Sequence, residues 1–215
     1  ISHNHYLSAS GGSKKATFYI GADYLTDEGI AITTGYDRLS LDMSSTLQAT
    51  KKLSITGHVM YSSTAQSAVS SYANLFYRSA SLPGTAKYKF LDGTLAPGQN
   101  SSIGNPIYYV KSPAAPKGSS NTDELTTSVS SHWDILPGLS FDPQLSLYKI
   151  YSDSYSFQPS YYNGVGSYVT TRVASSGYSK TTQYQADGVL TYSRSFANAH
   201  NLDDKAGVSY WEDDY

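Results

Sequence analysis

Two histidines stand two residues apart near the start of the chain, His3 and His5. If this segment is a strand, both side chains lie on one face and could hold a divalent ion together with a third ligand. The chain contains no cysteine, and no third ligand accompanies the pair in the sequence. We therefore predict no metal site and expect these histidines to have a polar role, facing a lumen or a loop.

Serine-based catalysis has little support. The chain is rich in serine, but it has no Gly-x-Ser-x-Gly segment to hold a nucleophile on a sharp turn. The pair Gly11-Gly12 lacks the following Gly-Lys-Ser/Thr of a phosphate-binding loop, and no predicted helix follows it. We predict that the chain is not an enzyme and binds no cofactor.

Tyrosine and asparagine offer binding without catalysis. Tyrosine rings stack on sugar faces, and side-chain amides form hydrogen bonds with hydroxyl groups. Six candidates for substrate contact lie in the two longest segments without strand patterning, namely Tyr108, Tyr109, Tyr161, Tyr162, Asn100 and Asn163. The alternative is that these rings pack the loops against each other or against a partner protein.

The composition restricts the class of protein. Charged residues make up 15% of the 215 residues, whereas an average soluble domain has roughly 25%. The net charge of −2 and the absence of a Lys/Arg cluster in the sequence argue against a nucleic-acid partner. No apolar run approaches the length of about 18 residues that a membrane-spanning helix needs. If the chain enters a membrane, we expect it to do so with strands.

Apolar and polar residues alternate in several segments, which is typical of strands with two different environments. In the segment 37–49, one face carries Leu39, Leu41, Met43, Leu47 and Ala49, and the other carries Arg38, Ser40, Asp42, Ser44, Thr46 and Gln48. Similar patterns run through 3–10, 16–24, 53–61, 125–135, 141–148, 183–192 and 202–211. The sequence therefore predicts about eight strands, each close to the ten or so residues that cross a bilayer at a tilt.

The connections between these strands alternate in length. Tight turns are expected at 11–15, 50–52, 136–139 and 197–201, and long loops at about 63–123 and 152–178. Outer-membrane barrels have short periplasmic turns and long extracellular loops. We predict an all-β fold, an antiparallel up-and-down transmembrane β-barrel. In this arrangement the first strand descends from outside, so we expect residues 1–215 to lie inside a longer protein.

Several short motifs occur in a characteristic order. They are His5 with the run from Leu7 to Ser13, Phe18-Tyr19, Tyr24, Glu28-Gly29-Ile30, Arg38, Leu82-Pro83-Gly84, Leu91-Asp92-Gly93-Thr94, Gly104-Asn105-Pro106-Ile107, His200 and Gly207. In order and spacing they resemble the SusC/RagA-type TonB-dependent transporters of Bacteroidota. The resemblance covers nearly the whole chain, although each motif alone is a weak signal.

This resemblance implies that residues 1–215 form a partial barrel domain, about eight strands of a barrel of about 22, without the plug domain and the TonB box. It further implies active import of glycans or oligopeptides across the bacterial outer membrane. The partners would be a SusD-like surface lipoprotein, the TonB-ExbB-ExbD complex acting through segments outside this chain, the remaining barrel and plug, and membrane lipid or lipopolysaccharide.

Two other classes of function stay open at this point. One is a self-contained small outer-membrane barrel or porin with a structural or passive role, which would suit the strand count. The other is a secreted β-rich module that binds carbohydrate through its tyrosines. Such a soluble module would bury one face of the sheet and carry charged side chains on the other, whereas the polar rows here contain few charged residues.

Overall fold

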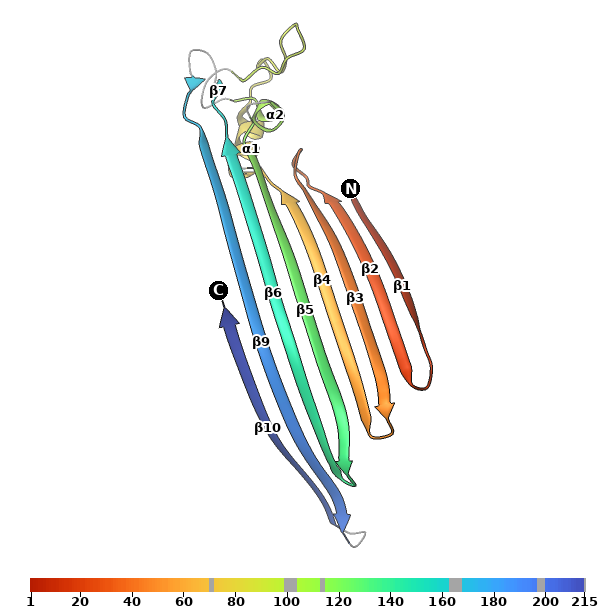
Figure 1. Ribbon diagram of the computed structural model, residues 1–215. Helices are drawn as coiled ribbons and strands as arrows, with labels where there is room; N and C mark the ends of the chain where they lie inside the picture. Colours follow the sequence, from red (N-terminus) through yellow and green to blue (C-terminus); the bar gives the residue numbers. More distant parts are fainter. Residues whose placement is uncertain (70–71, 99–103, 113–114, 163–167, 197–199, 215) are drawn as a thin grey trace.

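Eight long antiparallel strands form a single sheet in the computed structural model, which describes residues 1–69, 72–98, 104–112, 115–162, 168–196 and 200–214 (Figure 1). The strands are β1 (Ser2–Gly12), β2 (Ala16–Glu28), β3 (Gly35–Thr50), β4 (Leu53–Ser67), β5 (Lys117–Leu136), β6 (Leu139–Gln158), β9 (Val173–Phe196) and β10 (His200–Asp214). Each pairs with its neighbours in this order, so the connectivity is up and down throughout. The predicted all-β class and strand number are confirmed.

The strand register places the apolar residues predicted in single strands on the same face of the sheet. Leu41 on β3 pairs with Ala22 on β2 and Tyr61 on β4. Directly opposed residues of antiparallel strands lie on the same face. Asp42, one position on, pairs with Gly21 and Met60 and lies on the other face. We call the face that carries Leu41 the apolar face and the opposite one the polar face.

The apolar face is exposed over its whole width. Val129 on β5 and Leu145 on β6 oppose each other there and are 52% and 63% exposed. Leu7 on β1 is 77% exposed. On β5 the apolar residues of this face are Leu125, Val129 and Trp133, with Thr127 and Ser131 between them. The first and last are eight residues apart, which is about 26 Å along the strand. A strand tilt of about 40° reduces this to about 20 Å, close to the height of a barrel's apolar band.

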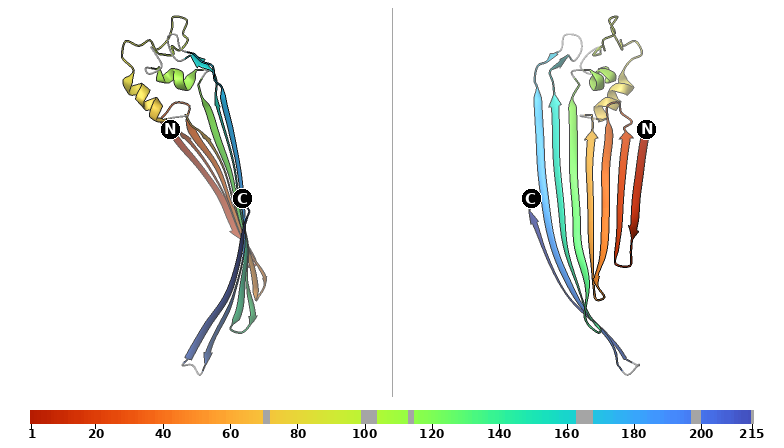
Figure 2. Two further views of the ribbon diagram at one scale, coloured as in Figure 1. Left: turned by 90° about the vertical axis from the view of Figure 1, so that its left-hand side faces the viewer. Right: turned by 45° about the vertical axis from the view of Figure 1, so that its right-hand side comes forward.

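Figure 2 shows the sheet as one curved layer with all its long connections at one end. We call this end the loop end and the opposite one the turn end. Two short connections at the turn end are Ser13–Lys15 and Pro137–Gly138, where Gly138 adopts a positive φ of 83°. The alternation of short and long connections is thus present in the described chain.

The strands run further toward the loop end than the alternation predicts. Residues 63–67 belong to β4 and 117–123 to β5, so the connection between them spans 68–116. Likewise 152–158 belong to β6 and 173–178 to β9, which leaves 159–172. The backbone ladder continues there and includes opposed polar residues such as Ser120 and Ser154. On β5 the alternation of apolar and polar residues stops at Leu125, but hydrogen bonding between the strands continues.

The described part of the loop 68–116 contains two short helices, α1 (Tyr72–Ser81) and α2 (Pro106–Lys111), which the sequence analysis did not predict. Asn105 explains the start of α2, because its side chain accepts a hydrogen bond from the Ile107 amide at 3.0 Å. The same side-chain amide donates to the carbonyls of Ala96 at 2.7 Å and Tyr88 at 3.1 Å. The Asn105-Pro106 motif therefore ties three parts of this loop together.

A small buried cluster lies in these loops rather than in the sheet. Ala31, Leu75 and Val110 form it, and Val69 and Tyr109 pack against it. Further out, a turn is closed by Asp92, which accepts hydrogen bonds from the Thr94 hydroxyl at 2.7 Å and the Thr94 amide at 2.9 Å. These bonds favour the ionised carboxylate and lower the pKa of Asp92 below its usual 3.8.

The outermost strands each have one neighbour. Within the described ranges, β1 pairs with β2 and β10 pairs with β9, and the two do not pair with each other. No helix in the described part of the chain is long and apolar enough to cross a membrane.

Candidate functional site

Side chains on the polar face bind one another across strands. An Arg38 Nη2 group lies 3.1 Å from Oδ1 of Asp23, and His58 Nε2 lies 2.8 Å from Oδ1 of Asp42. Further down, the hydroxyls of Thr46 and Thr56 are 3.0 Å apart. All of these side chains are partly exposed. The face is therefore hydrophilic but held in place by short cross-strand contacts.

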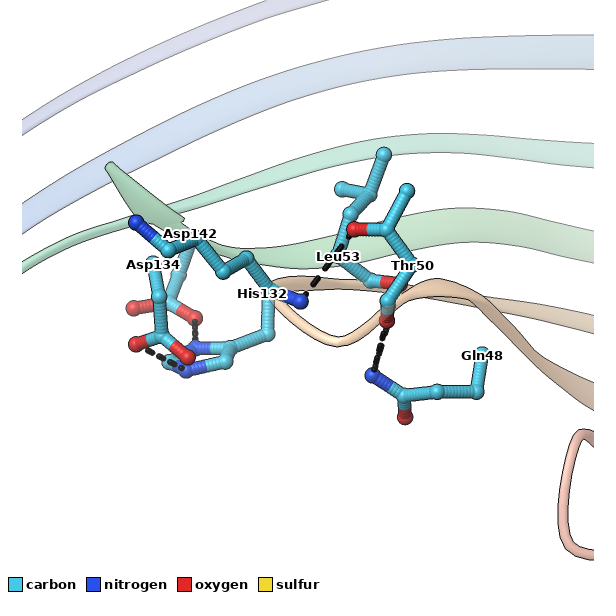
Figure 3. A network of polar contacts seen from close by, with 7 residues as sticks. Gln48, Thr50, Leu53, His132, Asp134 and Asp142 are labelled. Atoms are coloured by element: carbon cyan, nitrogen blue, oxygen red, sulfur yellow. Dashed lines mark hydrogen bonds and ion pairs between the residues drawn. The ribbon is translucent and has the colours of Figure 1, made fainter. Parts of the chain in front are cut away.

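A histidine lies between two carboxylates where the polar face reaches the turn end. His132 on β5 places Nδ1 2.5 Å from Asp142 of β6 and Nε2 3.4 Å from Asp134, as Figure 3 shows. Nearby, Gln48 donates to the Thr50 carbonyl at 2.8 Å. Among the described side chains, no group of three or more His, Cys, Asp or Glu has an arrangement that could hold a metal ion.

The polar face carries more acidic than basic groups. By register the carboxylates of its strands are Asp23, Asp27, Asp42, Glu124, Asp134, Asp142, Asp187, Asp203 and Asp213, and the permanent cations of its strands are Arg38 and Lys205. A water-filled space next to this face would therefore have a negative potential, which attracts cations and repels anions.

Two adjoining cavities open at the loop end, beside the β4–β5 connection. The larger, about 520 Å³, is lined by Tyr109 and Val110 of α2 together with residues on either side of the connection. The other, about 330 Å³, is lined by Tyr155, Phe157 and Gln158 of β6. Both include Ala68, Val69, Pro116, Lys117 and Gly118. These volumes suit a small ligand or one residue of a longer one.

The predicted substrate residues fall into separate places. Tyr109 lines the larger cavity, and its ring also lies 5.2 Å from the Arg78 guanidinium carbon. Tyr108 belongs to the same helix but does not line either cavity. Tyr161 and Tyr162 form the strand β7 (Tyr161–Tyr162), which pairs with β8 (Tyr168–Val169). Asn100 and Asn163 lie outside the described residues, and their part in substrate contact stays a prediction.

His3 and His5 do not face the polar side. His5 pairs with Tyr24, which pairs with Leu39, so both histidines lie on the apolar face at the loop end of β1. Of the expected lumen- or loop-facing role, the lumen-facing part is wrong for this pair, because parity along β1 places them with Leu7. The loop-facing part stays a prediction. Their partners, Thr26 and Tyr24, belong to β2.

Sequence reasoning missed most of the cavity residues and all of the cross-strand pairs. Phe157 lies in a stretch where serines alternate with Tyr155 and Phe157, but the predicted strand ended at residue 148 and did not include it. Arg38 and Asp42 were assigned correctly to the polar face of β3. Their partners Asp23 and His58 follow only from the register, which no single strand reveals.

Neither a protein-family model nor any curated protein matches the sequence. Solved structures match the fold. The RagAB peptide importer in its closed-closed state aligns over 99% of this chain with a TM-score of 0.75 at 16% identity. The Escherichia coli ferric-catecholate import receptor Fiu aligns over 99% with a TM-score of 0.60 at 10% identity. The Escherichia coli outer-membrane transporter YddB aligns over 100% with a TM-score of 0.55 at 14% identity.

The chain spans 24%, 32% and 27% of the RagAB, Fiu and YddB chains, respectively, so it corresponds to part of a larger wall. The neighbours are transporters and receptors of the outer membrane, and the predicted outer-membrane location agrees with them. At these identities the likeness concerns the fold. The chain has the fold of a segment of barrel wall from a TonB-dependent outer-membrane transporter of the SusC/RagA type.

Proposed function

We propose that this chain is part of the wall of a SusC-like TonB-dependent transporter that imports glycans or oligopeptides across the bacterial outer membrane. The observation that carries the proposal is the two-faced sheet, apolar on one side and hydrophilic on the other, in an up-and-down fold shared with such transporters. The remaining strands of the barrel would pair with β1 and β10.

Exposure of the apolar face supports placement in a bilayer. Large apolar side chains such as Leu7, Val129 and Leu145 are more than half exposed on it. Contiguous apolar surface of this extent is unfavourable in water and marks contact with a protein or a membrane. Hydrocarbon cannot accept hydrogen bonds, so the fully paired backbone ladder of the inner strands suits it as well.

The fold argues against the two alternative classes. A self-contained eight-stranded barrel needs β1 to pair with β10, and these strands do not pair in the described chain. A soluble carbohydrate-binding module needs a core beneath its sheet. The buried cluster of Ala31, Leu75 and Val110 is small and lies in the loops, so it does not cover the apolar face.

The polar face and the loop-end cavities suggest how cargo would be handled. Tyr109, Tyr155 and Phe157 give the cavities aromatic and apolar walls, and Lys117 and Gln158 add polar groups. Sugar rings and peptide side chains both suit such a mixture. The acidic polar face favours neutral or cationic cargo over polyanions. RagAB, which shares the fold, is described as a peptide importer, and this supports oligopeptides as one cargo class.

The proposed partners follow from the same assignment. A SusD-like lipoprotein would meet the loop end, where α1, α2 and the two cavities lie. The plug would face the polar side of the sheet, and TonB-ExbB-ExbD would act through segments outside this chain. Lipid and lipopolysaccharide would meet the apolar face.

Uptake of labelled oligopeptides and oligosaccharides by cells expressing the full-length protein tests the proposal. Uptake should stop when TonB is depleted, while surface exposure of the protein is unchanged. Substituting the cavity residue Tyr109→Leu should reduce uptake, and Tyr108→Leu on the same helix serves as the matched control. Uptake that persists without TonB would show a passive barrel, and equal effects of the two substitutions would remove Tyr109 from the cargo site.

A further inference from the structure

A tryptophan lies on the polar face near the end of the described chain. Trp211 on β10 pairs directly with Gln185 on β9. Gln185 lies two residues from Asp187, so both share the polar face. The residue before Trp211, Tyr210, lies on the opposite face, where it lines an apolar depression with Leu145. The Trp211 side chain is 68% exposed. A large aromatic ring therefore projects into the space that the polar face borders.

The groups around this ring are polar. Asp187 and Gln183 lie diagonally across from Trp211 on β9, and Ser209 precedes the ring on the same face of β10. Asp187 is held from two sides, because it accepts hydrogen bonds from the Gln185 amide at 2.8 Å and from the Ser209 hydroxyl. A glutamine amide has two donor hydrogens and a carbonyl acceptor, and this bond uses one of the donors. The ring is thus flanked by groups that can form hydrogen bonds with a ligand.

The height of Trp211 on the wall follows from its neighbours on β10. The apolar face of this strand includes Val208 and Tyr210 and is followed by Glu212 in the direction of the loop end. Trp211 therefore lies where the apolar face gives way to charge, on the side from which cargo would enter. Side chains of the polar face stand off the plane of the sheet. A further wall strand that pairs with β10 would border Trp211 without covering it.

We propose that Trp211 is a stacking platform for a sugar ring of neutral glycan cargo, with Gln183 and Gln185 binding the hydroxyls of that ring. This inference rests on the proposed function, because it requires the polar face to border the path of the cargo. A sugar ring has C–H groups on its face and hydroxyls at its edge, which matches an indole flanked by amides. An apolar peptide side chain would need further apolar neighbours, whereas the described residues opposite and diagonal to Trp211 are polar. The Asp187 carboxylate disfavours anionic glycans.

Equilibrium binding to the purified full-length protein in detergent tests this assignment. The probes are labelled neutral oligosaccharides of glucose, mannose, galactose, xylose and fructose, and a mixed library of short peptides. At least one oligosaccharide should bind, and Trp211→Ala should weaken its binding about tenfold, whereas Trp211→Tyr should retain most of it. Gln185→Leu should also weaken it. Tyr210→Ala is the matched control, because it removes the adjacent exposed ring on the apolar face, and it should leave the affinity unchanged.

Several results would overturn the inference while leaving the proposed function intact. One is the absence of binding by any oligosaccharide of the panel. Another is a glycan affinity that Trp211→Ala leaves unchanged, or that Tyr210→Ala lowers equally. A third is a loss of thermal stability in Trp211→Ala with glycan affinity unaltered, which would make the plug the occupant of this surface. Uptake of the same probes that persists in cells without TonB would instead refute the proposed function itself.

Discussion

Replacing Val129 by arginine puts a charge at the middle of the apolar face. Val129 lies halfway between Leu125 and Trp133, four residues from each, so it is about 13 Å along β5 from either end of the apolar stretch. Its side chain is 52% exposed, and it lines an apolar depression with Leu145, Leu147 and Ala186. In a barrel wall this position faces lipid near the bilayer midplane.

The expected cost of Val129→Arg is about 2–4 kcal/mol, the range for arginine at the midplane of a barrel's lipid face. This corresponds to a shift of about 30- to 700-fold in the folding equilibrium. Ser128→Arg is the matched control, because Ser128 is the adjacent residue on the polar face, opposite His58 and Ser146. We expect its effect to stay below about 1 kcal/mol, since the arginine remains hydrated.

Equilibrium unfolding of the full-length protein in lipid vesicles, followed by tryptophan fluorescence, measures both values. A large loss for Val129→Arg beside a small one for Ser128→Arg agrees with lipid on one face and water on the other. Equal losses, or tolerance of arginine at Val129, would show that the apolar face does not meet hydrocarbon.

Three further substitutions address the polar contacts and the loop end. Asp42→Asn should lower the free energy of unfolding by less than about 1 kcal/mol, because the pair with His58 is partly exposed. In a His58→Gln background the same substitution should have no effect, and an unchanged loss of stability would refute the contact. Asn105→Ala should lower the free energy of opening at α2 by about 2 kcal/mol, since a helix cap and two amide bonds disappear. Hydrogen exchange at the Ile107 amide measures this, and unaltered protection would contradict it. The pKa of Asp92 is lowered in the folded protein, so the hydrogen-bonded turn at Thr94 persists below pH 3.8 and opens as the pH falls through the folded pKa. Titration by NMR should show that Thr94→Val returns the pKa of Asp92 toward 3.8. An unchanged pKa would show that Thr94 is not the cause.

The strands and their two faces were predictable because alternation is a local property. Leu39, Leu41 and Met43 fall on one face of β3 both in the sequence and in the structure. The loop end of β5 was not predictable, because residues 117–123 pair with β6 without any apolar row to mark them. Alternation of apolar and polar residues marks only the part of a strand whose two faces have different environments, whereas the backbone hydrogen bonds between strands continue beyond that part.

The candidate site was predictable only in part, because it depends on contacts between distant segments. Tyr109 was identified as a binding residue and lines a cavity, whereas its neighbour Tyr108 lines neither. The start of α2 at Asn105 was visible only as a bend, since its capping and its bonds to Tyr88 and Ala96 need the folded loop.

The most direct measurement of the two-faced wall is a spin-label scan along β3 in the full-length protein reconstituted in a bilayer. Labels placed one at a time at positions 39–47 report collision with oxygen, which concentrates in lipid, and with a water-soluble nickel complex. Odd positions, including Leu41 and Met43, should favour oxygen, and even positions, including Asp42 and Ser44, should favour nickel, with a period of two. Oxygen and nickel profiles without this alternation, or odd positions reached by neither reagent, would contradict a wall with lipid on one side and water on the other.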